Sequence, residues 1–124
     1  MTGILLLAHG SREGDTEVTM HKVTAYVKDI LQNDMVEEAY LQFREQNLEN
    51  GLLRLIERGA GEIIVIPYFL FEGVHIKEDI PAELKEFCSH HPDIKITMGK
   101  TLGADRRLAD IVADRVRELL QLPE

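Results

Sequence analysis

The chain has 124 residues and a mass of 14.1 kDa, which is the size of one domain. It is 44% hydrophobic and 29% charged, an ordinary globular balance, and it is long enough to bury a core without disulfides. Fourteen Lys and Arg against 22 Asp and Glu give a net charge of -8. This charge argues against nonspecific nucleic-acid binding and against an anchor on anionic membranes.

The N-terminal apolar run covers only residues 4–8, which is far too short to span a membrane. No Lys or Arg precedes the run, so it does not have the pattern of a signal peptide. The one cysteine, Cys88, permits no internal disulfide and fits a reducing compartment. We therefore expect a cytoplasmic protein with no membrane partner.

Short apolar runs and helical periods alternate along the first half of the chain. Residues 4–8 predict a strand buried on both faces, and the spacing of apolar residues predicts a helix over 15–32. A second strand is expected over 35–43, with the Glu37-Glu38 pair as a solvated face. A second amphipathic helix begins near Leu48, and the glycines at 59 and 61 end it.

The second half repeats the alternation. Residues 62–70 predict the strongest strand, which should leave the sheet near Pro67 because proline cannot donate to the ladder. A third helix begins near Ile80, and residues 94–98 alternate as a half-buried strand. Gly103 and Asp105 open a last helix, whose apolar residues recur at helical spacing from Leu108.

Four strand–helix units predict an α/β fold with a mainly parallel, four-stranded sheet. The expected architecture is a flavodoxin-like three-layer αβα sandwich with strand order 2-1-3-4. The sequence has no repeat, linker or low-complexity tract, so residues 1–124 are expected to form a single domain.

In such sheets, ligands bind beyond the carboxyl ends of the strands at the point where the strand order reverses. His9 follows the first strand and His75 follows the third, 66 positions later, so both should face one crevice. Neutral imidazole binds Co, Ni, Fe and Zn, and an open two-ligand site favours metal delivery or catalysis. A general-base role for a histidine, or a plain turn position for His9, are the alternatives.

Other motifs are weaker. The chain has no glycine-rich dinucleotide or phosphate-binding fingerprint. The sequence Cys88-Ser89-His90-His91 is better explained as a helix end running into a solvated turn. The aromatic residues of 68–71 are either plain core or one wall of a site for a flat ligand.

Several segments resemble the short, CbiX-type sirohydrochlorin cobaltochelatases, which are class II chelatases. They are LLAHGSR at 6–12, the second-strand motif at 39–48, IPYFLFEGVH at 66–75 with DIP at 79–81, and TLGAD at 101–105. The resemblance covers the whole chain in the family's order and spacing. It implies a chelatase-like fold and the insertion of a divalent metal, here most simply Co²⁺, into sirohydrochlorin on a route to cobalamin, coenzyme F430 or sirohaem. The short form is expected to act as a homodimer.

The resemblance also assigns roles to residues. His9 corresponds to the catalytic base and a metal ligand, and His75 to the second metal ligand. The tetrapyrrole-contacting positions correspond to Glu45, Leu70, Phe71, Glu72, Gly73, Val74 and His75. The metal is implied as a substrate, with no permanently bound cofactor.

The sequence departs from the family at two positions. Gln42 stands where many relatives carry Glu, and Gln46 where many carry Pro, so Glu45 is the only carboxylate left in that motif. Backbone amides at the starts of the first and third helices, with Arg12 and Lys77, are expected to offset the repulsion of an anionic substrate.

Three functions stay open at this point. They are a chelatase for cobalt, nickel or iron; a non-catalytic carrier of metal or tetrapyrrole; and an orphan regulatory module on the same fold. The order of the motifs favours catalysis.

Overall fold

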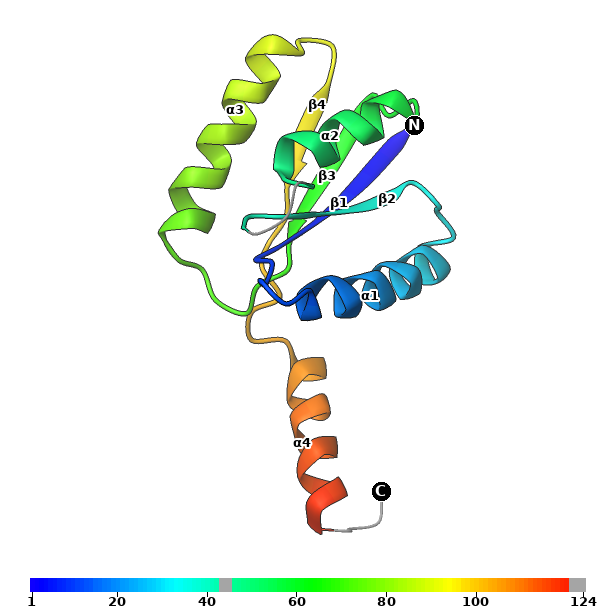
Figure 1. The fold of residues 1–124 in the computed structure, drawn as a ribbon, viewed down its shortest axis with the longest axis vertical. Helices are drawn as coiled ribbons and strands as arrows, with labels where there is room; N and C mark the ends of the chain where they lie inside the picture. Colours follow the sequence, from blue (N-terminus) through cyan, green and yellow to red (C-terminus); the bar gives the residue numbers. More distant parts are fainter. Residues whose placement is uncertain (43–45, 121–124) are drawn as a thin grey trace.

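The structure, a computed structural model, describes residues 1–42 and 46–120, except for the side chain at position 75. Strands and helices alternate along the chain, as Figure 1 shows. The elements are β1 (Thr2–Ala8), α1 (Asp15–Leu31), β2 (Val36–Tyr40), α2 (Leu48–Glu57), β3 (Glu62–Pro67), a π-helical turn η1 (His75–Asp79), α3 (Ile80–His90), β4 (Lys95–Met98) and α4 (Arg106–Leu120).

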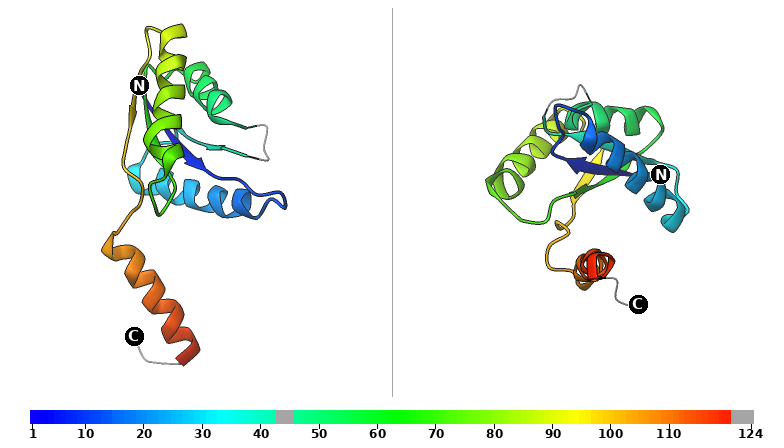
Figure 2. Two further views of the ribbon diagram at one scale, coloured as in Figure 1. Left: turned by 90° about the vertical axis from the view of Figure 1, so that its left-hand side faces the viewer. Right: turned by 60° about the horizontal axis from the view of Figure 1, so that its bottom comes forward.

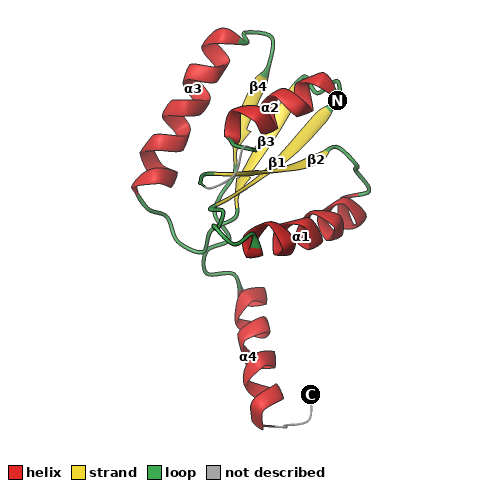
Figure 3. Cartoon of the chain, viewed as in Figure 1, coloured by secondary structure: helices red, strands yellow, loops and turns green. Residues whose placement is uncertain are grey.

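The four strands form one parallel sheet in the order β2-β1-β3-β4. This confirms the α/β fold and the strand order predicted from the sequence. The carboxyl ends of the strands meet at the lower edge of the sheet in Figure 3, where loops gather. β1 and β3 are neighbours, so the segments after Ala8 and Pro67 leave the same edge side by side.

Alternation along the strands divides the core into two clusters. On one face, Leu5, Leu7, Ile63 and Val65 are completely buried among residues of α2 and α3. On the other face, a smaller cluster of Leu6, Ala8, Val36 and Tyr40 packs with Met20 of α1. Two helices therefore cover one face, whereas α1 lies over β1 and β2 on the other.

Helix α4 does not complete the second layer. None of its residues is buried, and Figures 1 and 2 show it projecting away from the sheet and the other helices. The expected period of apolar residues is present, but the helix presents these side chains to solvent. The helical spacing was therefore predicted correctly, while the burial that it normally implies is absent.

Element boundaries follow local chemistry. β3 ends at Pro67, as expected for a residue that cannot donate to the ladder. β2 ends at Tyr40, earlier than the predicted strand, whose last residue Phe43 lies outside the described residues. The π-helical turn before α3 was not predicted.

The expectation that Glu37 and Glu38 form a solvated face was wrong. Glu38 is buried, because β2 carries it on the face that α1 covers. Glu37 is partly covered by Arg54 of α2 and by Arg58, which directly follows α2. Within residues 1–42 and 46–120, no helix is long and apolar enough to cross a membrane.

Candidate functional site

His9 lies directly after β1, at the carboxyl edge of the sheet. Its backbone carbonyl accepts a hydrogen bond from the Gln42 amide at 2.8 Å, one residue after Leu41 donates to Ala8. On the opposite side, the Tyr68 amide donates to the Leu7 carbonyl at 2.7 Å. The backbone that carries His9 is therefore held between the segments following β2 and β3.

The next residue, Gly10, allows this close approach. Its φ angle is 92°, in the left-handed region that favours glycine. A Cβ atom added to Gly10 would lie 2.1 Å from the Gln42 carbonyl oxygen, far inside van der Waals contact. The chain therefore needs glycine here for both the backbone angle and the space.

The His9 side chain is exposed and lies edge-on to Phe69. The two ring centroids are 5.0 Å apart and the ring planes make an angle of 86°. This is the T-shaped arrangement that aromatic pairs favour, and it restricts the orientation of the imidazole. One edge of the imidazole is thereby supported, while the ring stays accessible to a ligand.

Two hollows border the His9–Phe69 pair. Both are lined by His9, Phe69 and Tyr68. The larger, of about 460 Å³, is a mainly apolar groove. Its lining is His9, Leu41, Tyr68, Phe69, Leu70, Phe71, Glu72, Gly73, Val74 and Ile76. The smaller, of about 360 Å³, extends from His9 towards Asp15, Thr16 and Thr19 at the start of α1. His9 thus stands between two mainly apolar grooves, and the lining of the smaller one also includes the Asp15 carboxylate and the Thr16 and Thr19 hydroxyls.

The structure brings together most of the residues that the sequence singled out. The segment 70–74 forms one side of the larger groove with His9, and it carries apolar side chains outward into solvent. Phe71 is 81% exposed, Val74 66% and Leu70 50%. Exposed apolar side chains beside a polar group are typical of a binding surface.

Two predicted positions cannot be placed in the same way. Glu45 lies outside the described residues. His75 is the first residue of η1 and directly follows the groove-lining segment 70–74. Its side chain is not among the described parts of the structure. Pairing of His9 with His75 therefore stays a prediction. Among the side chains that the structure does describe, no group of three or more His, Cys, Asp or Glu converges as a metal site.

The start of α1 differs from the expected anion site. Asp15 and Glu17 occupy its first turn, where their charges already interact favourably with the helix dipole. Asp15 also lines the smaller hollow beside His9, which the sequence analysis did not anticipate. The sequence did contain a signal for this position, because Asp15 begins the helix that directly follows the loop after His9.

A separate hollow of about 370 Å³ lies between α2 and α3, away from His9. Its lining includes His90 and His91 with the carboxylates Glu49, Glu83 and Glu86. Burial raises the pKa of Glu83, and the nearby charge of Glu49 raises it further. This hollow has an acidic rim, and Leu48 is its only lining residue from the segments that carry the family motifs.

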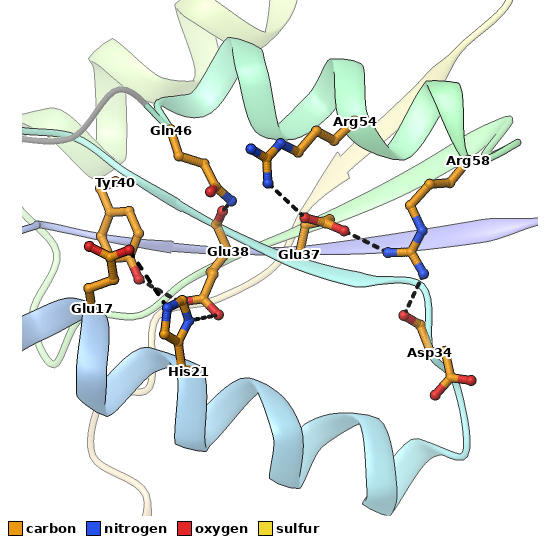
Figure 4. Close-up of polar contacts among 9 residues, drawn as sticks. All are labelled: Glu17, His21, Asp34, Glu37, Glu38, Tyr40, Gln46, Arg54 and Arg58. Atoms are coloured by element: carbon orange, nitrogen blue, oxygen red, sulfur yellow. Dashed lines mark hydrogen bonds and ion pairs between the residues drawn. The ribbon is translucent and has the colours of Figure 1, made fainter.

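A polar network ties β2 to the helices, as Figure 4 shows. The buried Glu38 carboxylate accepts a hydrogen bond from the Tyr40 hydroxyl and lies 2.8 Å from His21 Nδ1 on α1. The hydrogen bond to Glu38 raises the pKa of His21; desolvation opposes this shift, and the charges of Glu38 and Glu17 add to it. On the other side of the strand, Glu37 pairs with Arg58 at 2.6 Å. These groups fix β2 and take no direct part in the His9 site.

Comparisons with known proteins point to one family. A family model described as CbiX matches residues 3–119. The sirohydrochlorin cobaltochelatase of Methanopyrus kandleri is 31% identical to this chain, with 97% of this chain and 98% of that protein covered. The sirohydrochlorin cobaltochelatase of Sulfolobus acidocaldarius is 30% identical over 98% of this chain and 95% of that protein.

Solved structures agree with these sequence matches. A cobalamin biosynthesis CbiX protein from Marinobacter aquaeolei aligns over 98% of both chains, with a TM-score of 0.81 and 27% identity. The sirohydrochlorin chelatase SirB of Bacillus subtilis, solved in complex with cobalt, gives a TM-score of 0.86 and 29% identity. That alignment covers 94% of this chain but 50% of the SirB chain, so this chain matches half of the longer protein.

Proposed function

The chain belongs to the CbiX family, and from this membership we propose that it inserts Co²⁺ into sirohydrochlorin. Relatives that match it over nearly their whole length are named cobaltochelatases, whereas longer relatives are named ferrochelatases. Cobalt is therefore the first choice of metal, with iron and nickel as alternatives. We further propose that residues 1–124 act as one domain in the cytoplasm.

The observation that carries the proposal is the position of His9. Its imidazole is exposed at the carboxyl edge of the sheet, is supported by Phe69, and borders the groove formed by residues 70–74. A flat macrocycle has a large apolar face, which the exposed Phe71 and Val74 side chains would cover. The same placement would bring the pyrrole nitrogens towards His9.

The overall reaction exchanges two pyrrole protons for one metal ion: M²⁺ enters the ring and two H⁺ leave. We assign the metal to His9 and His75, because neutral imidazole is a good ligand for divalent cobalt, nickel and iron. Once His9 has released the metal to the ring, its free nitrogen is available to accept a pyrrole proton. His75 would keep the departing metal over the ring during the transfer.

The substrate is polyanionic and the protein carries a net charge of -8, so long-range attraction is absent. We propose that the apolar ring enters the groove while the carboxylates on the ring periphery stay in water. Arg12 and Lys77 are both exposed near the groove-forming segments and offer charge-assisted contacts. We assign Glu45 to the same substrate surface.

We also propose that the active form is a homodimer. This chain matches 50% of the length of the SirB chain, so a single copy offers one wall to the macrocycle. A second copy would supply the other wall.

The test is optical. Purified protein is mixed with sirohydrochlorin and Co²⁺, and the visible spectrum is followed beside a protein-free control; Ni²⁺ and Fe²⁺ are tested under anaerobic conditions. We expect many turnovers per subunit. His9→Ala and His75→Ala should each abolish insertion, whereas His90→Ala, in the separate hollow between α2 and α3, should leave the rate unchanged.

Two outcomes would contradict the proposal. Near-normal turnover by His9→Ala or His75→Ala would refute the two-histidine model. Binding of Co²⁺ or of the macrocycle without acceleration for any metal would identify a carrier and reduce His9 to a ligand.

A further inference from the structure

The smaller hollow beside His9 has no role in the reaction described so far. It shares His9, Tyr68 and Phe69 with the larger groove, so both hollows open onto the same imidazole. The larger groove is assigned to the flat ring of sirohydrochlorin. A ring that lies in that groove leaves the smaller hollow as a second opening onto His9.

A tight loop brings the start of α1 back to the end of β1, as Figure 1 shows. The Gly14 amide donates to the Ser11 carbonyl at 3.4 Å, and the Thr16 amide donates to Ser11 Oγ at 3.3 Å. Gly14 has a φ angle of 82°, which lets the chain turn directly into the helix. Because both hydrogen bonds meet at Ser11, two residues after His9, the first turn of α1 has a fixed position beside the histidine.

Asp15 supplies the negative charge of the smaller hollow. It is the one carboxylate among the described residues that line this hollow, and no Lys or Arg is among them. The Asp15 carboxylate makes no hydrogen bond or ion pair with any residue that the structure describes. Glu17 in the same turn, by contrast, lies 3.6 Å from His21 Nε2. Asp15 is therefore available to a ligand.

The charge of Asp15 outweighs the helix dipole at this point. The first turn of a helix carries about half a positive charge, whereas the carboxylate carries a full negative charge. The hollow therefore attracts a cation and repels the carboxylates of an anionic substrate. The two substrates of a chelatase, a polyanion and a dication, are separated by this difference.

The size and the oxygen atoms of the hollow suit a hydrated divalent ion. Its volume is about 360 Å³, and six waters at ~30 Å³ each would occupy about 180 Å³. The Asp15 carboxylate and the Thr16 and Thr19 hydroxyls are oxygen donors, which accept an ion that keeps part of its water shell. Among the described side chains, no group of three or more His, Cys, Asp or Glu converges here to retain the ion. The hollow is thus suited to passage rather than to storage.

We propose that the smaller hollow is the entrance for the metal substrate, and that Asp15 is the carboxylate that attracts the hydrated ion and passes it to His9. This inference rests on the chelatase function proposed above and deepens it by giving the two substrates separate routes. The apolar ring enters the larger groove, whereas the dication enters through the acidic hollow. Asp15 binds the incoming ion and takes no part in proton transfer.

Steady-state kinetics with varied Co²⁺ test the role of Asp15. We expect Asp15→Asn to raise the KM for Co²⁺ about fivefold, the effect of one exposed charge on a nearby dication at physiological salt. The values of kcat and of the KM for sirohydrochlorin should stay unchanged, and Asp15→Glu, which keeps the charge, should keep the wild-type KM for Co²⁺. The matched control is Glu13→Gln, which removes the same charge from an exposed residue outside the lining of the hollow.

Two kinetic results would overturn the proposal. Equal effects of Asp15→Asn and Glu13→Gln would mean that the ion responds to net charge alone. A rise in the KM for Co²⁺ with Glu72→Gln but not with Asp15→Asn would place the metal route in the larger groove, which Glu72 lines.

Excess sirohydrochlorin distinguishes the two routes. If the ion entered through the larger groove, a bound ring would block it, and high concentrations of sirohydrochlorin would inhibit competitively with Co²⁺. Separate entrances predict no such inhibition, and its presence would contradict the proposal.

Binding of Co²⁺ to the protein alone gives a readout that needs no turnover. Stopped-flow absorption of the bound cobalt should show association about fivefold slower in Asp15→Asn, with dissociation unchanged. An association rate equal to that of the wild type would refute a role for Asp15 in metal entry. If Asp15 controls cobalt association but no insertion occurs, the chelatase proposal fails while the metal entrance stands.

Discussion

Replacing Gly10 by alanine tests whether the close contact after β1 holds the site together. The substitution forces an alanine into φ 92° and places its Cβ 2.1 Å from the Gln42 carbonyl oxygen. The backbone angle alone costs about 1–2 kcal/mol. To relieve the overlap between this Cβ and the Gln42 oxygen, the segments that follow β1 and β2 must move apart, at a cost of about 1–3 kcal/mol. We therefore expect the free energy of unfolding to fall by about 2–5 kcal/mol.

Two other glycines provide matched controls. Gly59 has φ 102°, but an added Cβ would meet only the Met1 sulfur at 4.0 Å. Gly59→Ala should therefore show the cost of the backbone angle alone, about 1–2 kcal/mol. Gly61 has an unstrained φ and nothing within 4 Å, so Gly61→Ala should be neutral or stabilise by about 0.4–1 kcal/mol.

Urea unfolding followed by circular dichroism measures all three variants. With a slope of about 2 kcal/mol per molar urea, the midpoint of Gly10→Ala should fall by about 1–2.5 M. The folded fraction of this variant should also lose chelatase activity, because the separation of the strand ends moves the His9 backbone. A loss in Gly10→Ala no larger than that in Gly59→Ala would refute the steric argument, since the Gln42 carbonyl would then impose no constraint.

Three further substitutions probe the network on β2 and the wall of the site. Glu38→Ala leaves the buried Tyr40 hydroxyl without its acceptor and should cost about 1–3 kcal/mol in urea unfolding; no change would mean that water replaces the carboxylate. His21→Gln should destabilise the fold by less than about 1 kcal/mol at pH 6, because the ring is largely exposed, and by less still at pH 9. Phe69→Leu removes the edge contact with His9, which is worth about 0.5–1.5 kcal/mol. We expect the rate of metal insertion to fall by a larger factor than this loss of unfolding free energy explains. An unchanged rate would show that the imidazole needs no such support.

The pH dependence of His21→Gln follows from the sign of its pKa shift. Folding raises the pKa of His21 above its usual 6.5, so the protonated ring stabilises the native state. This stabilisation is fully present below the unfolded pKa and is lost as pH rises through the folded value. The difference between wild type and variant should therefore shrink with increasing pH, and a difference that grows would contradict the assignment.

The sequence was sufficient for those features that depend on local pattern. Continuous apolar runs predicted β1 and β3, and Pro67 marked the end of β3 because proline has no amide N–H to donate to the ladder. The strand order then placed His9 beside the segment 70–74, and the structure confirms this juxtaposition. A motif that ends a buried strand is positioned by topology, so it can be located without coordinates.

Features that depend on partners were not predictable in this way. Two adjacent glutamates on a strand look solvated, yet Glu38 is buried, and its carboxylate is satisfied by Tyr40 on the same strand and by His21 on helix α1. The periodicity of α4 predicted a helix but not its direction, because the three residues after Leu102 decide where the helix points. An amphipathic pattern predicts which side chains of a helix are to be buried. It does not predict the surface on which they pack.

The π-helical turn η1 fixes the length of the segment that borders the groove. Ile76 within the turn and Ile80 at the start of α3 are both buried, so both ends of η1 are anchored in the core. Deleting one residue between them would rotate everything before it by ~100° and shift it by ~1.5 Å relative to α3. Leu70 and Phe71 would then face a different direction while the rest of the fold stayed intact. Insertions and deletions should therefore be tolerated here far less than at the exposed Pro92 and Asp93 in the turn before β4.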